Sequence, residues 1–142
     1  MEPEPLNRLV GEWVTKVGVV GAPAGRVMFE WALGGKYLIQ RSETPQPEFP
    51  DTLAIIAPAG DSEYSQHYFD SRGVVRIYRM TLPDGRWTLL RTEPDFSPLD
   101  FWQRFEGRFS ADGDSIDGRW ESSHDAGATW EIDFALTYTR IT

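Results

Sequence analysis

The residues of this sequence that could carry chemistry are few, and they are separated by apolar, alternating segments. There is no cysteine, which excludes disulfides, thiolate metal ligands and a cysteine nucleophile. The two histidines, His67 and His124, lie far apart in the sequence and lack the close spacing that gathers metal ligands. We therefore expect no metal site and no cofactor.

Polar side chains recur within segments that otherwise read as β-strands, and these side chains are the candidates for contact with a ligand. A few polar groups within an apolar, aromatic interior are typical of small-molecule pockets. Guanidinium groups on an inward face need a partner, which is a carboxylate of the protein itself, water or an anionic ligand. Six residues are expected to line the interior and contact a ligand: His67, Arg76, Tyr78, Arg91, Gln103 and Tyr138.

The placement of these residues rests on the alternation of apolar side chains along the predicted strands. In the segment 74–82 the competing face carries Ile77 and Arg79, and it is shorter and less apolar than the face of Tyr78 and Met80. The faces expected to point inward are those of Val74, Arg76, Tyr78, Met80 and Leu82, of Trp87, Leu89 and Arg91, and of Phe101, Gln103, Phe105, Gly107 and Phe109.

His67 is the candidate for acid–base chemistry, because it shares a face with Phe69 that could point into an aromatic interior. The alternative is a core or edge histidine bonded to a neighbouring strand. No pattern of nucleophilic catalysis is present, and Glu30, Glu106 and Glu121 fall on outward faces. A binding protein is therefore more strongly expected than an enzyme.

The segment 123–130 resembles the Asp-box, Ser-x-Asp-x-Gly-x-Thr-Trp, a hairpin motif of sialidases and other β proteins. We expect the Asp125 carboxylate to accept backbone N–H groups, Gly127 to adopt a positive φ and Trp130 to anchor the next strand. The resemblance implies a structural turn and not a catalytic site.

Turn signals recur roughly every eight to twelve residues, a spacing typical of all-β sandwiches and barrels. In the last segment Trp130, Ile132, Phe134, Leu136 and Tyr138 are expected to face one way. The predicted strands cover 12–20, 26–33, 36–43, 52–57, 63–70, 74–82, 86–93, 101–110, 115–122 and 129–141.

These ten predicted strands are joined mostly by short turns, which favours antiparallel pairing of sequence neighbours. Pairing of the first strand with the last would remove two exposed edges. We therefore predict one all-β domain over 1–142, a ten-stranded antiparallel up-and-down barrel with a short N-terminal lead-in helix. This lead-in, helical or looped, lies in the stretch 6–13 and places Trp13 at the start of the first strand.

Composition narrows the classes of partner. The formal net charge of −8, from 22 acidic and 14 basic residues, disfavours binding to nucleic acid or to anionic membranes. Residues 1–5 have neither a basic nor an apolar region, so they do not predict a signal peptide, and no apolar run has the length of a membrane span. A cytoplasmic protein is expected.

Gly11-Glu12-Trp13 resembles the Gly-x-Trp that begins the first strand of lipocalins and other calycins, and the spacing over the whole chain is similar to bacterial ten-stranded calycin-like domains. The resemblance implies that a basic residue near the end of the last strand, here Arg140, packs across Trp13. The order Tyr138-Thr139-Arg140 departs from the Arg-x-Tyr of fatty-acid-binding proteins, and the long Gly-rich opening of nitrobindins is absent, so haem binding is disfavoured.

Three functions are consistent with this pattern. The leading hypothesis is a barrel that binds a small apolar or anionic molecule in its interior. The second is an enzyme that uses His67, with Arg76 and Tyr78 stabilising an oxyanion. The third is a filled barrel that acts through association, for example as a homodimer.

Overall fold

The structure, a computed structural model, describes residues 5–18, 24–44, 50–95 and 98–141 of the 142-residue chain. Residues 1–4, the end of the first predicted strand at Val19 and Val20, and parts of the loops predicted around 21–25, 44–50 and 94–100 lie outside the described residues. In the described part of the chain, no helix has the length and apolar character needed to cross a membrane.

Almost all regular structure in the described residues is β. A 3-10 helix, η1 (Pro5–Arg8), precedes the first strand and is the only part of the predicted lead-in that is helical. The strands are β1 (Gly11–Val17), β2 (Gly25–Ala32), β3 (Tyr37–Glu43), β4 (Thr52–Gly60), β5 (Glu63–Asp70), β6 (Val75–Thr81), β7 (Arg86–Arg91), β8 (Trp102–Phe109), β9 (Ser115–Ser123) and β10 (Glu131–Arg140).

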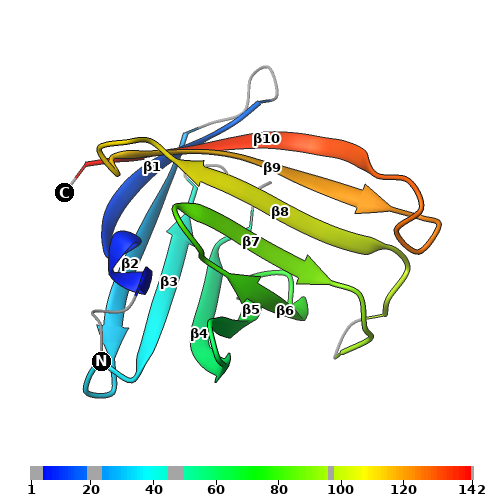
Figure 1. Ribbon diagram of the computed structural model, residues 1–142, viewed down its shortest axis with the longest axis horizontal. Helices are drawn as coiled ribbons and strands as arrows, with labels where there is room; N and C mark the ends of the chain where they lie inside the picture. The colour runs from blue at the N-terminus through cyan, green and yellow to red at the C-terminus, as the bar shows by residue number, and fades with distance from the viewer. Residues whose placement is uncertain (1–4, 19–23, 45–49, 96–97, 142) are drawn as a thin grey trace.

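The ten strands form a closed antiparallel barrel in which each strand pairs with its neighbours in sequence and β1 pairs with β10 (Figure 1). The predicted fold class is confirmed. Trp13 is the register partner of Arg140 across the β1–β10 pair and of Val27 across the β1–β2 pair. The ladder therefore has no open edge.

The expected contact between Trp13 and Arg140 is present where β1 and β10 pair to close the barrel. Trp13 is 0% exposed, and the Arg140 guanidinium carbon lies 4.2 Å from the centroid of its ring. The Trp13 indole N–H donates to the backbone oxygen of Leu9 (2.9 Å), and Arg140 donates to those of Val10 and Arg8 (2.6 Å each). The cation–π contact and the hydrogen bonds to backbone carbonyls thus hold the N-terminal segment against the barrel where β1 meets β10.

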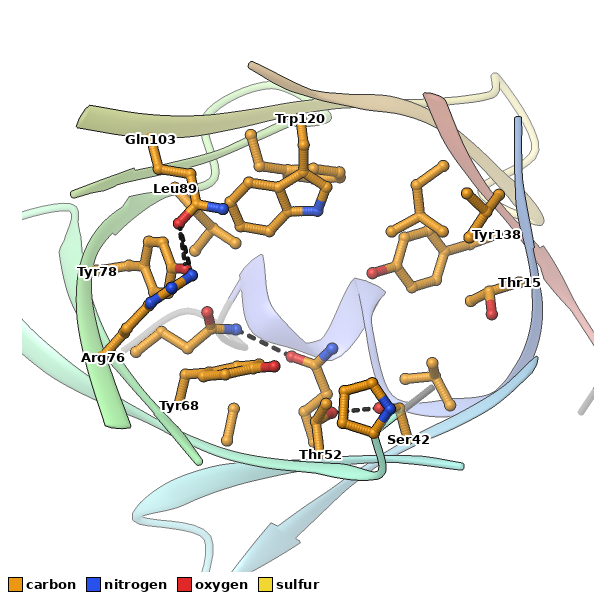
Figure 2. Close-up of a pocket in the computed structure, with 18 of the residues that line it drawn as sticks. Thr15, Ser42, Thr52, Tyr68, Arg76, Tyr78, Leu89, Gln103, Trp120 and Tyr138 are labelled. Carbon is orange, nitrogen blue, oxygen red and sulfur yellow. Dashed lines mark hydrogen bonds between the residues drawn. The ribbon is translucent and has the colours of Figure 1, made fainter. Parts of the chain in front are cut away.

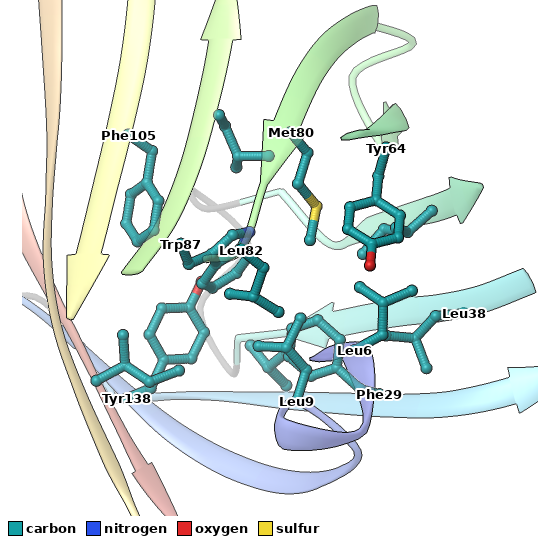
Figure 3. Close-up of a cluster of buried hydrophobic side chains, with 14 of the residues drawn as sticks. Leu6, Leu9, Phe29, Leu38, Tyr64, Met80, Leu82, Trp87, Phe105 and Tyr138 are labelled. Carbon is teal, nitrogen blue, oxygen red and sulfur yellow. The ribbon is translucent and has the colours of Figure 1, made fainter. Parts of the chain in front are cut away.

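One half of the barrel is solidly packed (Figure 3). Phe105 lies over the cross-strand pair Gly107 and Gly118, where a Cβ at either glycine would come within 2.9 Å of its ring. Side chains there would exclude the Phe105 ring. The other members of this core include Leu6, Leu9, Trp13, Phe29, Leu38, Ile56, Met80, Leu82, Trp87, Ile116 and Tyr138.

The predicted inward faces of β6, β7 and β8 are correct, since Tyr78, Met80, Trp87, Leu89 and Phe105 are all buried. The expected faces of His67 on β5 and of Ile132 on β10 are wrong.

On β5 it is Tyr64 and Gln66 that are buried, so the face of His67 and Phe69 points outward. On β10, Ile132 is 66% exposed, because the register with β9 shifts between Ile132 and Phe134. A bulge places an extra residue in one strand and so changes the phase of the alternation.

The predicted turn after β9 has the expected hydrogen bonds. The Asp125 carboxylate accepts from the backbone N–H of Thr129 (2.8 Å), the Ser123 hydroxyl accepts from the N–H of Gly127 (2.8 Å), and Gly127 has a φ of 89°. Trp130 lies against Arg104, whose guanidinium carbon is 4.0 Å from its ring centroid. The segment is a hairpin turn.

Candidate functional site

The other half of the barrel holds a cavity of about 540 Å³ (Figure 2). Its lining reaches from Trp87 and Tyr138, at the packed core, to Glu43, Thr44 and Pro50 at the loop between β3 and β4. The volume lies within the range of roughly 300–1,000 Å³ that is usual for small-molecule sites.

Most of the cavity wall is apolar and aromatic. Trp120 on β9 packs against Phe105 (ring centroids 5.3 Å apart) and Tyr78 (5.6 Å), and Trp87 packs against Tyr138 (5.6 Å). Such contacts hold the rings in fixed positions around the space. The apolar lining residues include Val17, Val27, Ala54, Trp87, Leu89, Phe105, Trp120, Phe134 and Leu136.

Arg76, Tyr78 and Gln103 form a polar cluster on the wall made by β6 and β8. The Gln103 Oε1 atom accepts from the Tyr78 hydroxyl (2.8 Å) and from an Arg76 Nη atom (3.3 Å). Arg76 is half-buried and has no ion pair among the described residues, and its buried Nε has no hydrogen-bond partner there. This guanidinium therefore keeps unused donors beside the cavity.

Apart from Glu43 at the end of β3, Gln40, Ser42, Thr52 and Gln66 give the adjoining wall, on β3 to β5, neutral polar groups. The Gln66 amide donates to the Gln40 Oε1 atom (2.9 Å), and the hydroxyls of Ser42 and Thr52 are hydrogen-bonded to each other. Both pairs join side chains from different strands, so they hold the wall together. They leave further amide and hydroxyl positions for a ligand.

Tyr68 belongs to a network at the strand end that is already satisfied. Its hydroxyl donates to Asp70 (2.8 Å), which also accepts from Arg72 in an ion pair. Burial alone raises the pKa of Asp70, but the hydrogen bonds from Arg72 and Tyr68 outweigh it and hold that pKa at about 2. Asp70 and Arg72 therefore neutralise each other, and among the described residues of this wall Arg76 is the guanidinium without a carboxylate partner.

The Tyr138 hydroxyl lies on the opposite wall and points towards the centre of the cavity (Figure 2). Within the described part of the chain it has no hydrogen-bond partner, although the residue is only 5% exposed. Burial raises the pKa of Tyr138 and also that of Tyr78. Both hydroxyls therefore stay protonated near neutral pH and act as neutral donors.

Of the six residues predicted to contact a ligand, four line the cavity: Arg76, Tyr78, Gln103 and Tyr138. His67 does not. It lies between the inward-facing Gln66 and Tyr68, is half-buried on the outer surface and pairs in register with Ile55 and Ile77. The expectation that His67 contacts a ligand depended on an inward face for this residue, and the structure places that face of β5 on the outside.

Arg91 faces inward as predicted, but its charge is already matched within the protein. It is 2% exposed and forms a bidentate pair with Asp95 (2.9 Å for each bond), and it donates to the backbone oxygen of Pro98 (3.1 Å). Asp95 also accepts from the backbone N–H of Ile77 (2.8 Å). Of the partners considered for an inward guanidinium, Arg91 therefore has a carboxylate of the protein itself. Arg91 does not line the cavity.

Residues that the sequence reasoning missed include Gln40, Gln66, Tyr68 and Trp120. A signal for two of them was available. Gln66 is the register partner of Tyr78, and Tyr68 is the register partner of Arg76, across the β5–β6 hairpin. Directly paired residues of adjacent strands point to the same side of a sheet, so the inward face of β6 determines that of β5.

No protein-family model matches the sequence, and no curated protein matches it significantly. Among solved structures, that of Rv2717c from M. tuberculosis is similar, with a TM-score of 0.66 and 13% sequence identity over 100% of both chains. At this identity the similarity shows the fold alone. It supports the barrel fold, and the function has to be inferred from the cavity.

Proposed function

We propose that this protein binds a small, largely apolar molecule carrying one anionic group, with the apolar body in the barrel and the anion at Arg76. The observation that carries the proposal is a cavity of about 540 Å³, walled by aromatic rings, beside a guanidinium that has no carboxylate partner in the described residues. A pocket with few, well-placed polar groups is the usual form of a small-molecule site. A calycin-like binding barrel is the class of protein that we infer.

The electrostatics favour an anionic group over a neutral one. Removing a guanidinium from water is costly unless an anion and further hydrogen bonds replace the lost hydration. Gln103 supplies a neutral acceptor to Arg76, and the Tyr78 hydroxyl shares that acceptor. A carboxylate or similar anion would add the negative charge that the described residues do not place at Arg76.

The two competing functions have less support. The enzyme hypothesis required His67 to face the cavity, and His67 lies on the outer surface. The filled-barrel hypothesis required a solid interior, whereas the described residues surround a cavity of about 540 Å³ next to the packed core. In the described residues there is also no cluster of three or more histidine, aspartate or glutamate side chains placed to hold a metal ion.

Replacing Arg76 by glutamine should weaken the binding of para-phenylbenzoate roughly tenfold to a hundredfold, because a charge-assisted hydrogen bond is lost. The affinity of the neutral para-phenylbenzamide should change far less. Isothermal titration calorimetry of both compounds, within a panel of aryl and alkyl carboxylates, measures the difference directly.

Arg79→Gln is the matched control. Arg79 lies three positions further along β6, is exposed, and contacts Thr92 outside the cavity (3.4 Å). The Arg79→Gln substitution removes the same charge and should leave the affinities for para-phenylbenzoate and para-phenylbenzamide unchanged. Equal losses in the two variants would show that the carboxylate responds only to net charge, and failure of every carboxylate to bind would overturn the proposed function.

A further inference from the structure

The cavity has a second polar position that faces Arg76. In the closed ring of ten strands, β1 and β6 are separated by five steps in either direction, so they lie on opposite sides of the barrel. Arg76 and Tyr78 belong to β6, whereas Thr15 belongs to β1 and its register partner Tyr138 to the adjacent β10. Figure 2 shows the two groups across the cavity from each other.

Resting on the proposed function, we propose that the Tyr138 hydroxyl, with Thr15 beside it, forms a second subsite that binds an uncharged oxygen at the far end of the ligand. The ligand class is then an elongated molecule with an apolar, aromatic-compatible middle, an anionic group at one end and a hydroxyl or carbonyl oxygen at the other.

The state of the Tyr138 hydroxyl carries this inference. The ring of Tyr138 is fixed by an edge contact with Trp13 (ring centroids 6.2 Å apart) and a tilted contact with Trp87 (5.6 Å), so its hydroxyl is held in one direction. That hydroxyl lines the cavity without a partner in the described residues, whereas Tyr68 and Tyr78 both donate to other side chains. A hydroxyl that is exposed to a largely apolar cavity and has no partner among the described residues can bond a ligand oxygen placed there.

The groups near Tyr138 favour a neutral oxygen there over a second anion. Thr15 supplies a hydroxyl, and Val27, Trp87 and Leu136 supply apolar surface. Among the described residues that line the cavity, none on β1 or β10 is a cation or belongs to an ion pair. The one charged lining residue there, Asp133 of β10, is acidic. The guanidinium is on the other side, which fixes the orientation of the ligand.

The test uses two rod-shaped acids that differ by one hydroxyl: para-phenylbenzoate and para-(para-hydroxyphenyl)benzoate. Wild-type protein should bind the hydroxylated acid roughly threefold to tenfold more tightly, the effect of one neutral hydrogen bond. Tyr138→Phe keeps the ring and removes the hydroxyl. It should abolish this preference while leaving the affinity for para-phenylbenzoate within about twofold, since that acid has no oxygen to lose a bond.

Tyr68→Phe is the matched control, because Tyr68 also lines the cavity but its hydroxyl is already bonded to Asp70. The preference should survive in that variant, and Arg76→Gln should weaken both acids equally. A preference that persists in Tyr138→Phe, or that is missing from wild-type protein while para-phenylbenzoate still binds through Arg76, would overturn the second subsite alone. Failure of both acids to bind would overturn the proposed function with it.

Discussion

Replacing Trp13 by alanine should lower the free energy of unfolding by about 3–5 kcal/mol, the usual cost of removing a fully buried tryptophan. Trp13 is 0% exposed and makes edge contacts with Phe109 (ring centroids 6.4 Å apart) and Tyr138 (6.2 Å). Its loss opens a void in the packed half, removes the surface on which Arg140 stacks and leaves the Leu9 carbonyl without its donor. Chemical denaturation followed by far-ultraviolet circular dichroism measures the change.

Trp130→Ala is the control for loss of a tryptophan as such. Trp130 is half-buried outside the packed core and contacts Arg104 through a cation–π interaction. Its removal should cost about 1 kcal/mol. A similar, small loss in both variants would contradict the role given to Trp13 in closing the barrel.

Replacing Asp95 by alanine should destabilise the protein by about 3–5 kcal/mol, because it leaves the charge of Arg91 buried without its carboxylate. Both side chains are almost completely inaccessible. On β6 the register pairing with β7 covers only Arg79 to Thr81. Earlier on β6, the backbone N–H of Ile77 donates to the Asp95 carboxylate instead. The substitution should therefore also loosen the contact between the loop after β7 and the start of β6.

The exposed pair of Arg41 and Glu30, 3.9 Å apart, provides the comparison. Glu30→Ala should cost less than about 1 kcal/mol, as is usual for surface ion pairs. Thermal and chemical denaturation of the two alanine variants, side by side, separates the buried pair from the surface pair. Equal stability of the Asp95 and Glu30 variants would mean that Arg91 does not depend on Asp95.

The architecture could be predicted from the sequence because it depends on local signals. Turn residues mark the ends of the strands, and alternation identifies the inner face wherever one face is clearly more apolar, as with Tyr78 and Met80 on β6. Short turns restrict the chain to antiparallel pairing of neighbouring strands, which gives a meander. Pairing of the first strand with the last then closes the barrel. The resemblance of Trp13 and Arg140 to the calycin pair correctly predicted their contact.

The site was predicted only in part because it depends on register and on loops. Both faces of β5 carry aromatic and polar side chains, so alternation did not distinguish His67 from Gln66, and only pairing with β6 does so. The bulge that exposes Ile132 leaves no mark in the alternation. Asp95 lies in a loop, where no periodicity connects it to Arg91.

The most direct test of the central claim, that the barrel cavity binds an apolar anion, is to locate para-phenylbenzoate on the protein by NMR. Indole N–H and side-chain amide signals distinguish the inside from the outside. Trp120 and Gln103 line the cavity, whereas Trp31 bonds Asn7 (2.8 Å) and Trp130 lies against Arg104. We predict that the signals of Trp120 and Gln103 shift on titration while those of Trp31 and Trp130 stay in place. Shifts confined to Trp31 or Trp130, or no shift at saturating ligand, would contradict the claim.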